Sequence, residues 1–161
     1  MTVVPAPTAA VRLVPQENTN TEYPCEVWAL PHHAQAVPTS RRITARALTV
    51  WGIADDTAHQ AVLVVSELVA NAVAHALPPI ALHLNPPSAR GVIHVEVDDG
   101  GPASVEATKI AAGTEDEHGR GCLIIDALTR DHGCRPYVDH TSNWAEIETS
   151  CTSLCTVREA G

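Results

Sequence analysis

Residues 61–76 have the sequence AVLVVSELVANAVAHA, and this segment is the most informative one about the fold. It is almost entirely apolar, so as a helix we expect it to be buried on nearly every side. Three polar side chains interrupt it at four-residue intervals, namely Glu67, Asn71 and His75. Because residues four apart lie one turn above one another on a helix, the three form a single polar stripe. A charge without a partner is costly to bury, so this stripe needs partners.

Two explanations of the polar stripe stay open. In the first, the stripe faces a polar ligand. A carboxylate and an amide one turn apart suit a hydrated Mg²⁺ ion and its phosphates, because Mg²⁺ takes oxygen ligands and keeps several waters. In the second, hydrogen bonds within the core satisfy the stripe, because buried polar groups usually find partners.

Carboxylates and glycines follow a predicted strand. Residues 93–97 alternate between apolar and polar, which is typical of a half-buried strand. They lead into residues 98–101, Asp-Asp-Gly-Gly. This order places a hydrogen-bond acceptor beside a backbone that a planar ligand can approach closely. The alternative interpretation is an ordinary Asp-Gly turn.

A second pair of glycines lies further along the chain. Gly119 and Gly121 precede an apolar run with helical character from Cys122 to Leu128. Free N–H groups at the start of a helix can bind an anion, and glycine lets a phosphate come close. Arg120 and His118 could add positive charge there.

In this order and at these separations, the three segments resemble the ATP-binding domain of the GHKL superfamily of gyrases, heat-shock chaperones, histidine kinases and mismatch-repair ATPases. Residues 67–71 resemble its N-box, residues 99–101 its first glycine box and residues 119–121 its second. The sequence more specifically resembles one branch, the small anti-sigma-factor serine kinases and the related stand-alone ATP-binding regulators abundant in actinobacteria. Four segments carry that likeness: SRRITARALTVWGI (40–53), VVSELVANAVAHA (64–76), HGRGCLIIDAL (118–128) and NWAEIE (143–148).

The resemblance runs from about Cys25 to Glu148 and implies a fold. That fold is a Bergerat-type α/β fold, an α+β two-layer sandwich whose helices cover one face of a mixed, mostly antiparallel sheet. ATP would lie between helices and sheet under a lid, which we place at residues 104–117. The sequence pattern predicts the elements themselves: strands at 22–30, 80–84, 92–97, 135–138 and 143–148, and helices at 38–51, 55–76 and 122–128.

The resemblance also implies roles for single residues. Asn71 would coordinate a Mg²⁺ ion that bridges the phosphates, and Glu67 would be the catalytic general base. Asp99 would accept a hydrogen bond from the adenine amino group; Asp98 is in phase with the polar side of its strand instead. The other expected nucleotide contacts are Gly101, Gly119, Arg120, Gly121 and Ser142.

The chain departs from this branch in two places. Ala103 stands where the branch often has a further glycine. Residues 140–142, His-Thr-Ser, stand where it usually has Gly-Lys-Thr. The lysine is therefore absent, and Ser142 would replace the threonine near adenine.

By resemblance we expect a regulator that binds Mg-ATP, phosphorylates a serine of a STAS-type anti-anti-sigma protein and sequesters a sigma factor. The alternative is a non-catalytic module that holds a partner and transfers no phosphate. Kinases of this branch commonly form homodimers, so a homodimer is also expected.

Composition narrows the class of protein. A length of 161 residues predicts one domain, which we place at residues 22–149 between an N-terminal arm (1–21) and a tail (150–161). A net charge of −9 with a single lysine argues against binding a nucleic-acid backbone. Five cysteines without a Cys-x-x-Cys pair argue against a disulfide framework or structural zinc. No signal peptide or membrane span is visible, so we expect a cytoplasmic protein.

Overall fold

The structure is a computed structural model that describes residues 23–104 and 119–150, with only the backbone described at residues 119 and 120. The predicted arm at residues 1–21 lies outside this part of the chain. So do the predicted lid beyond Ser104 and the predicted tail beyond Ser150.

A five-stranded sheet forms one layer, in the order β1-β2-β3-β5-β4. Every neighbouring pair among these described strands is antiparallel, so the sheet is antiparallel throughout rather than mixed. The reason lies in the connections. The two helices between β1 and β2 run along the sheet in opposite directions. β2 therefore starts at the end of the sheet where β1 finishes and runs antiparallel to it. The strands are β1 Glu26–Leu30, β2 Ile80–Asn85, β3 Val92–Asp99, β4 Asp131–Pro136 and β5 Thr141–Glu148.

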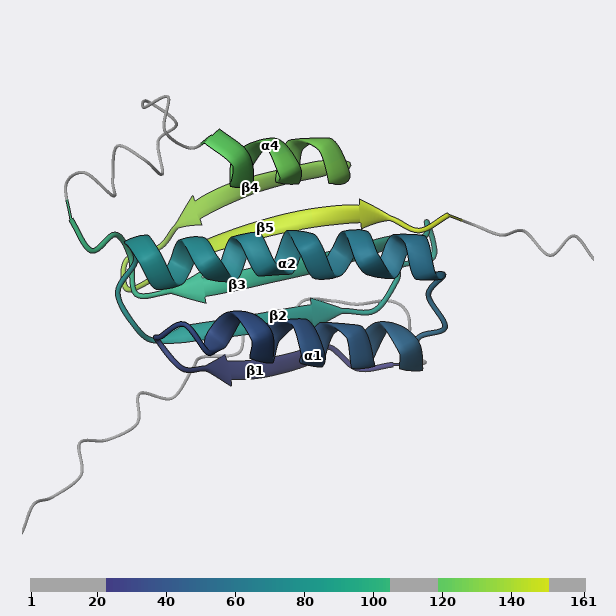
Figure 1. Cartoon of the computed structure of the whole chain (residues 1–161), viewed down its shortest axis with the longest axis horizontal. Helices are drawn as coiled ribbons and strands as arrows, with labels where there is room; N and C mark the ends of the chain where they lie inside the picture. Colours follow the sequence, from purple (N-terminus) through teal and green to yellow (C-terminus); the bar gives the residue numbers. More distant parts are fainter. Residues whose placement is uncertain (1–22, 105–118, 151–161) are drawn as a thin grey trace, which may run out of the picture.

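Three described helices form the second layer and cover one face of the sheet (Figure 1): α1 Ala36–Val50, α2 Asp55–His75 and α4 Gly119–Leu128. The two-layer α+β fold predicted from the sequence is thereby confirmed. Gly52, with φ +67°, follows the end of α1, where a left-handed conformation is needed to turn the chain. Asp55 and Asp56 begin α2, where their charge complements the helix dipole.

The hydrophobic core lies between the helices and the covered face of the sheet. Val64, Val65 and Val69 of α2 have no exposed surface. By length and a mean hydropathy of 1.2 α2 would pass for a membrane span, yet its apolar side packs onto the sheet. The expectation that this helix is buried on nearly every side is wrong, because no described element covers its outer side. Leu63 is 40% exposed there, and Asn71 and Ala74 are exposed too.

One end of the sandwich gathers the segments singled out in the sequence. The C-terminal half of α2, the end of β3, the start of β5 and the first turn of α4 all lie at this end (Figure 1). The loop after β3 is joined to the end of α2 by three backbone hydrogen bonds. Gly100 N–H donates to Leu77 O at 2.6 Å, Leu77 N–H to Gly101 O at 2.8 Å, and Ala103 N–H to His75 O at 2.9 Å.

This junction requires a glycine at position 100. A Cβ atom on Gly100 would lie 2.3 Å from Pro78 O and 2.8 Å from Leu77 O, both of them backbone atoms. Leu77 O cannot move away without breaking its hydrogen bond with Gly100 N–H. The close approach of two backbones is therefore what excludes a side chain here.

We predict that Gly100→Ala lowers the free energy of unfolding by about 1 to 3 kcal/mol, since the added methyl group overpacks the junction. Urea denaturation followed by circular dichroism measures the change. Ala89→Ser, at an exposed position in the loop between β2 and β3 at the other end of these strands, serves as the control and should change stability by less than about 0.5 kcal/mol. Equal stabilities for the two variants would contradict the account of the junction.

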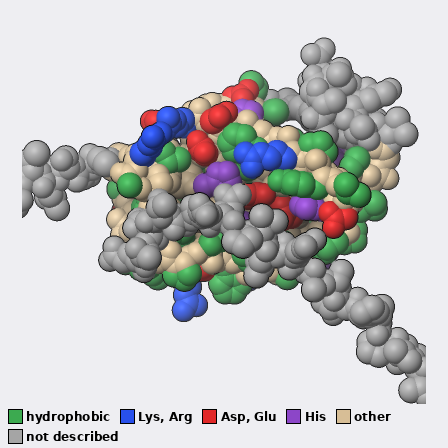
Figure 2. All heavy atoms as spheres, turned by 180° about the vertical axis from the view of Figure 1, so that it is seen from behind, with side chains coloured by type: hydrophobic (Ala, Val, Ile, Leu, Met, Phe, Trp, Pro, Cys, Tyr) green, Lys and Arg blue, Asp and Glu red, His purple; other side chains and the backbone are tan. Residues whose placement is uncertain are grey.

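The other face of the sheet, which we call the open face, is covered by no described helix. Directly opposite residues of an antiparallel pair lie on the same face, and β3 sends His94, Glu96 and Asp98 to this one. His83 Nε2 lies 2.9 Å from Asp98 Oδ2, and His94 Nε2 lies 3.4 Å from Glu96 Oε2. Figure 2 shows this face, with histidine and carboxylate side chains gathered near its centre.

Glu96 is held in its charged form by this network. The hydrogen bond with His94 lowers the pKa of Glu96; burial opposes this, and the Ser142 hydroxyl lowers it again, giving a value of about 2. The unfolded value is 4.5, so the folded pKa is depressed. The stabilisation is therefore fully present above the unfolded pKa and is lost as the pH falls toward 2.

We predict that Glu96→Gln lowers the free energy of unfolding by about 2 to 3 kcal/mol at pH 7, and that the difference from the unaltered chain shrinks as pH approaches 2. Urea titrations at pH 7, 5 and 3 test this. Glu146→Gln is the control, because its carboxylate is 36% exposed and 3.8 Å from His94 Nδ1. A Glu96→Gln effect independent of pH would show that charge at this position does not stabilise the fold.

Candidate functional site

Two polar residues of α2 face the first turn of α4. A Cβ atom on Gly121 would lie 2.6 Å from Glu67 Oε2 and 4.0 Å from Asn71 Oδ1. Because residue 121 is a glycine, no side chain separates the Glu67 carboxylate and the Asn71 amide from the first turn of α4. Glu67 is half-buried and Asn71 is exposed, so both are accessible from outside the core.

Asp99 lies on the helix-covered face of the sheet, at the end of β3. It continues the row of Ile93, Val95 and Val97, each with no exposed surface, and is itself only 5% exposed. Gly101 N–H donates to its Oδ1 at 2.8 Å, and Asn143 Nδ2 donates to its Oδ2 at 3.2 Å. Asp98 points to the open face instead, where it pairs with His83.

Burial raises the pKa of Asp99, and the charge of Asp98 raises it further. The Gly101 N–H, the charge of His140 and the amide of Asn143 act in the opposite direction. A buried carboxylate is costly unless it is hydrogen-bonded, and the described residues give Asp99 two donors, Gly101 N–H and Asn143 Nδ2. Its oxygens can accept further hydrogen bonds from a ligand.

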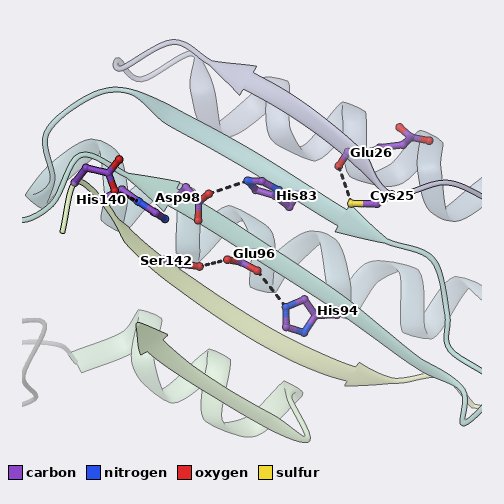
Figure 3. A network of polar contacts seen from close by, with 9 residues as sticks. Cys25, Glu26, His83, His94, Glu96, Asp98, His140 and Ser142 are labelled. Carbon is purple, nitrogen blue, oxygen red and sulfur yellow. Dashed lines mark hydrogen bonds and ion pairs between the residues drawn. The ribbon is translucent and has the colours of Figure 1, made fainter. Parts of the chain in front are cut away.

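Ser142 is not brought to this group of residues. It pairs with Asp98 across β3 and β5 and so lies on the open face. Its hydroxyl donates to Glu96 Oε1, and Figure 3 shows this contact beside the Glu96–His94 pair. The expectation that Ser142 lies near an adenine ring does not fit this register. Thr141 and Asn143, its neighbours in sequence, point to the side of Asp99.

Asn143 is the site residue that sequence reasoning missed. The row of β5 on the covered face consists of Thr141, Asn143, Ala145 and Ile147, so two polar residues precede two buried apolar ones. Both were visible in the sequence, but the importance of Asn143 depends on the register that sets it beside Asp99. Cys134 of β4 pairs with Asn143 and shares its face; burial, followed by the Asp99 charge, raises the pKa of its thiol.

The glycines of the two predicted glycine boxes occupy different environments. Gly101 has φ +91°, a backbone conformation that favours glycine. A Cβ atom there would lie within 4 Å of no atom of the described residues. Gly101 therefore shapes the turn and leaves space beside Asp99. Gly119 and Gly121 belong to the first turn of α4, which begins three residues earlier than predicted. The N–H groups of a first helical turn have no partner within the helix. The predicted phosphate contact of the Arg120 side chain falls outside the described side chains.

These residues fit Mg-ATP chemically. Asp99 offers an acceptor for an amino group on a flat ring, and the turn at Gly101 leaves room beside it. The first turn of α4 offers N–H groups to phosphate. The described residues contain no group of three or more His, Cys, Asp or Glu that could hold a metal ion. Mg²⁺ needs no such cage, since one or two protein oxygens, phosphates and water suffice.

The comparisons with known proteins bear on the same segments. No curated protein matches this chain as a relative. The family described as "Histidine kinase-like ATPase domain" matches residues 30–144, which include the polar stripe of α2, Asp99 and the first turn of α4. The match covers well over half of the 161 residues, so this protein belongs to the histidine kinase-like ATPase domain family.

Proposed function

We propose that this chain binds Mg-ATP between α2 and the covered face of the sheet, and that it transfers the γ-phosphate to a serine of an anti-anti-sigma protein. Membership of the family implies ATP binding. The observation that carries the proposal is the position of Asp99. It is a buried acceptor at the same end of the sandwich as Glu67, Asn71 and the start of α4.

The two ends of the nucleotide would meet different chemistry. Asp99 accepts from the amino group of the base, and Gly101 leaves space for the ring. Asn71 supplies an amide oxygen to Mg²⁺, and the first-turn N–H groups of Gly119 and Gly121 receive the phosphates. When bound, Mg²⁺ neutralises charge on the phosphates, which matters in a chain of net charge −9.

Glu67 is the proposed general base. It accepts the proton of the partner's serine hydroxyl as the serine oxygen bonds to the γ-phosphorus. The bond from that phosphorus to the bridging oxygen breaks, and ADP leaves. Phosphoryl transfer depends mainly on positioning and electrostatics, so one base and a bound Mg²⁺ are sufficient. The half-buried setting of Glu67 beside Gly121 supports this role, since it lies next to the expected phosphates.

The partners and the compartment follow from the resemblance to anti-sigma-factor kinases. A STAS-type anti-anti-sigma protein is the proposed substrate, a sigma factor is the proposed sequestered partner, and the cytoplasm is the proposed location. A homodimer is the proposed assembly. Two departures support the alternative of a non-catalytic binding module. Ala103 replaces a glycine, and the lysine before β5 is absent.

We predict that Asp99→Asn weakens Mg-ATP binding by at least about tenfold, because the amide replaces an acceptor-only carboxylate by a weaker, neutral acceptor. Isothermal titration calorimetry on the full chain measures the affinity. Asp98→Asn is the matched control: the same change one residue earlier, on the open face, should leave the affinity within about twofold. If the unaltered chain binds no ATP, the proposed function is wrong.

A second substitution separates the kinase from the binding module. Glu67→Gln should bind Mg-ATP as the unaltered chain does but lose phosphate transfer to a STAS-type partner by at least about a hundredfold, since removing a general base costs 10²–10⁴-fold. Radiolabelled γ-phosphate incorporation measures the transfer. Asp56→Asn, an exposed carboxylate at the far end of α2, is the control. Binding without transfer by the unaltered chain would favour the non-catalytic module.

A further inference from the structure

Two polar residues interrupt apolar rows at the same end of the sheet. Asp99 ends the row of Ile93, Val95 and Val97 on β3, and on β5 Asn143 follows Thr141 in the row that continues with Ala145 and Ile147. Asn143 is paired with Val97, so Asp99 is its diagonal neighbour on the same face. A polar residue in such a row costs free energy unless it has a partner.

The two interruptions are partners of each other. Asn143 Nδ2 lies 3.2 Å from Asp99 Oδ2, within hydrogen-bond distance. Only the amide nitrogen of asparagine carries hydrogens, so in this contact asparagine donates and the carboxylate accepts. Gly101 N–H donates to the other carboxylate oxygen at 2.8 Å. Each oxygen thus receives one donor and keeps lone-pair capacity for a ligand.

We propose that Asn143 is a positioning residue for base recognition: it holds the Asp99 carboxylate in one orientation and in its accepting form, and so selects a purine with an amino group at C6 over one with a carbonyl oxygen there. The inference rests on the proposed function, because it concerns the base end of the same nucleotide site. Nothing in the resemblance to the family assigned a role to this position.

The charges around Asp99 explain why a second donor is needed. Burial and the neighbouring Asp98 charge both raise the pKa of Asp99, and the Cys134 thiol lies on the same face of β4. His140, in the turn between β4 and β5, favours the ionised form. The Gly101 and Asn143 donors do the same. A protonated Asp99 would offer an O–H donor to the ligand, and removal of Asn143 shifts the balance in that direction.

The accepting form discriminates between purines. Adenine presents an N6 amino donor, whereas guanine presents the O6 acceptor at the equivalent position. An ionised carboxylate accepts from the first and repels the second. A carboxyl group that takes up a proton can donate to O6 instead, and a carboxylate that rotates freely makes a weaker contact with N6. Loss of Asn143 should therefore weaken ATP binding and relax the preference for ATP over GTP together.

The test uses Asn143→Leu, which keeps a similar size but has no donor, and Asn143→Ala, which cannot clash with its neighbours. Calorimetry on the full chain gives the affinities for Mg-ATP and Mg-GTP, and thermal melting reports folding. We expect either variant to bind ATP on the order of tenfold more weakly and the ATP-to-GTP affinity ratio to fall on the order of tenfold. Glu146→Gln, on the open face of the same strand, should change neither affinity beyond about twofold.

The outcomes separate this inference from the proposed function. If the unaltered chain binds ATP and a folded Asn143 variant keeps both its ATP affinity and its preference over GTP, the positioning role is overturned and the nucleotide site stands. Equal weakening of ATP and GTP would also overturn it, because a purely structural residue would do the same. If the unaltered chain binds neither nucleotide, the proposed function fails first and this inference fails with it.

Discussion

The hydrogen-bonded junction between the end of α2 and the loop after β3 fixes the geometry of the candidate site. Gly100 N–H and Leu77 N–H each donate across it, and the absence of a side chain at Gly100 lets the two backbones meet. Backbone hydrogen bonds of this kind fix the position of a segment because neither partner can rotate away. This junction fixes the position of the end of β3 relative to the polar stripe of α2.

Alternation along β3 then divides its polar residues between two faces. Asp98, Glu96 and His94 form polar contacts with His83 and Ser142 on the open face (Figure 3). Asp99 lies on the covered face at the end of an apolar row, where Gly101 N–H and Asn143 Nδ2 donate to it. The two adjacent carboxylates thus have different surroundings, and the proposed ligand contact falls to Asp99.

An acidic chain that binds a polyanion must arrange its local polarity against its net charge. The described residues around Glu67, Asn71 and Gly121 offer an amide, a carboxylate and the start of a helix, with no lysine among them. Uncharged N–H groups and a metal ion can take over the role that basic side chains play elsewhere. A net charge of −9 is therefore compatible with nucleotide binding, because local groups and Mg²⁺ can offset it.

The helices and most of the strands could be predicted from the sequence, but the fourth strand was misplaced: β4 runs over Asp131–Pro136 rather than the predicted 135–138. Periods of 3.6 and 2 are local properties, so the spacing of Glu67 and Asn71 and the alternation of residues 93–97 could be read without a fold. Which face of β5 lies beside Asp99 depends on the register of strand pairing, which the sequence pattern does not give. A slip of one residue exchanges the two faces of a strand, and the pairing of Val97 with Asn143 brings Asn143, rather than Ser142, to the site. The wholly antiparallel order of the described strands and the requirement for Gly100 likewise depend on the tertiary structure, because both arise from segments distant in sequence that meet only after folding.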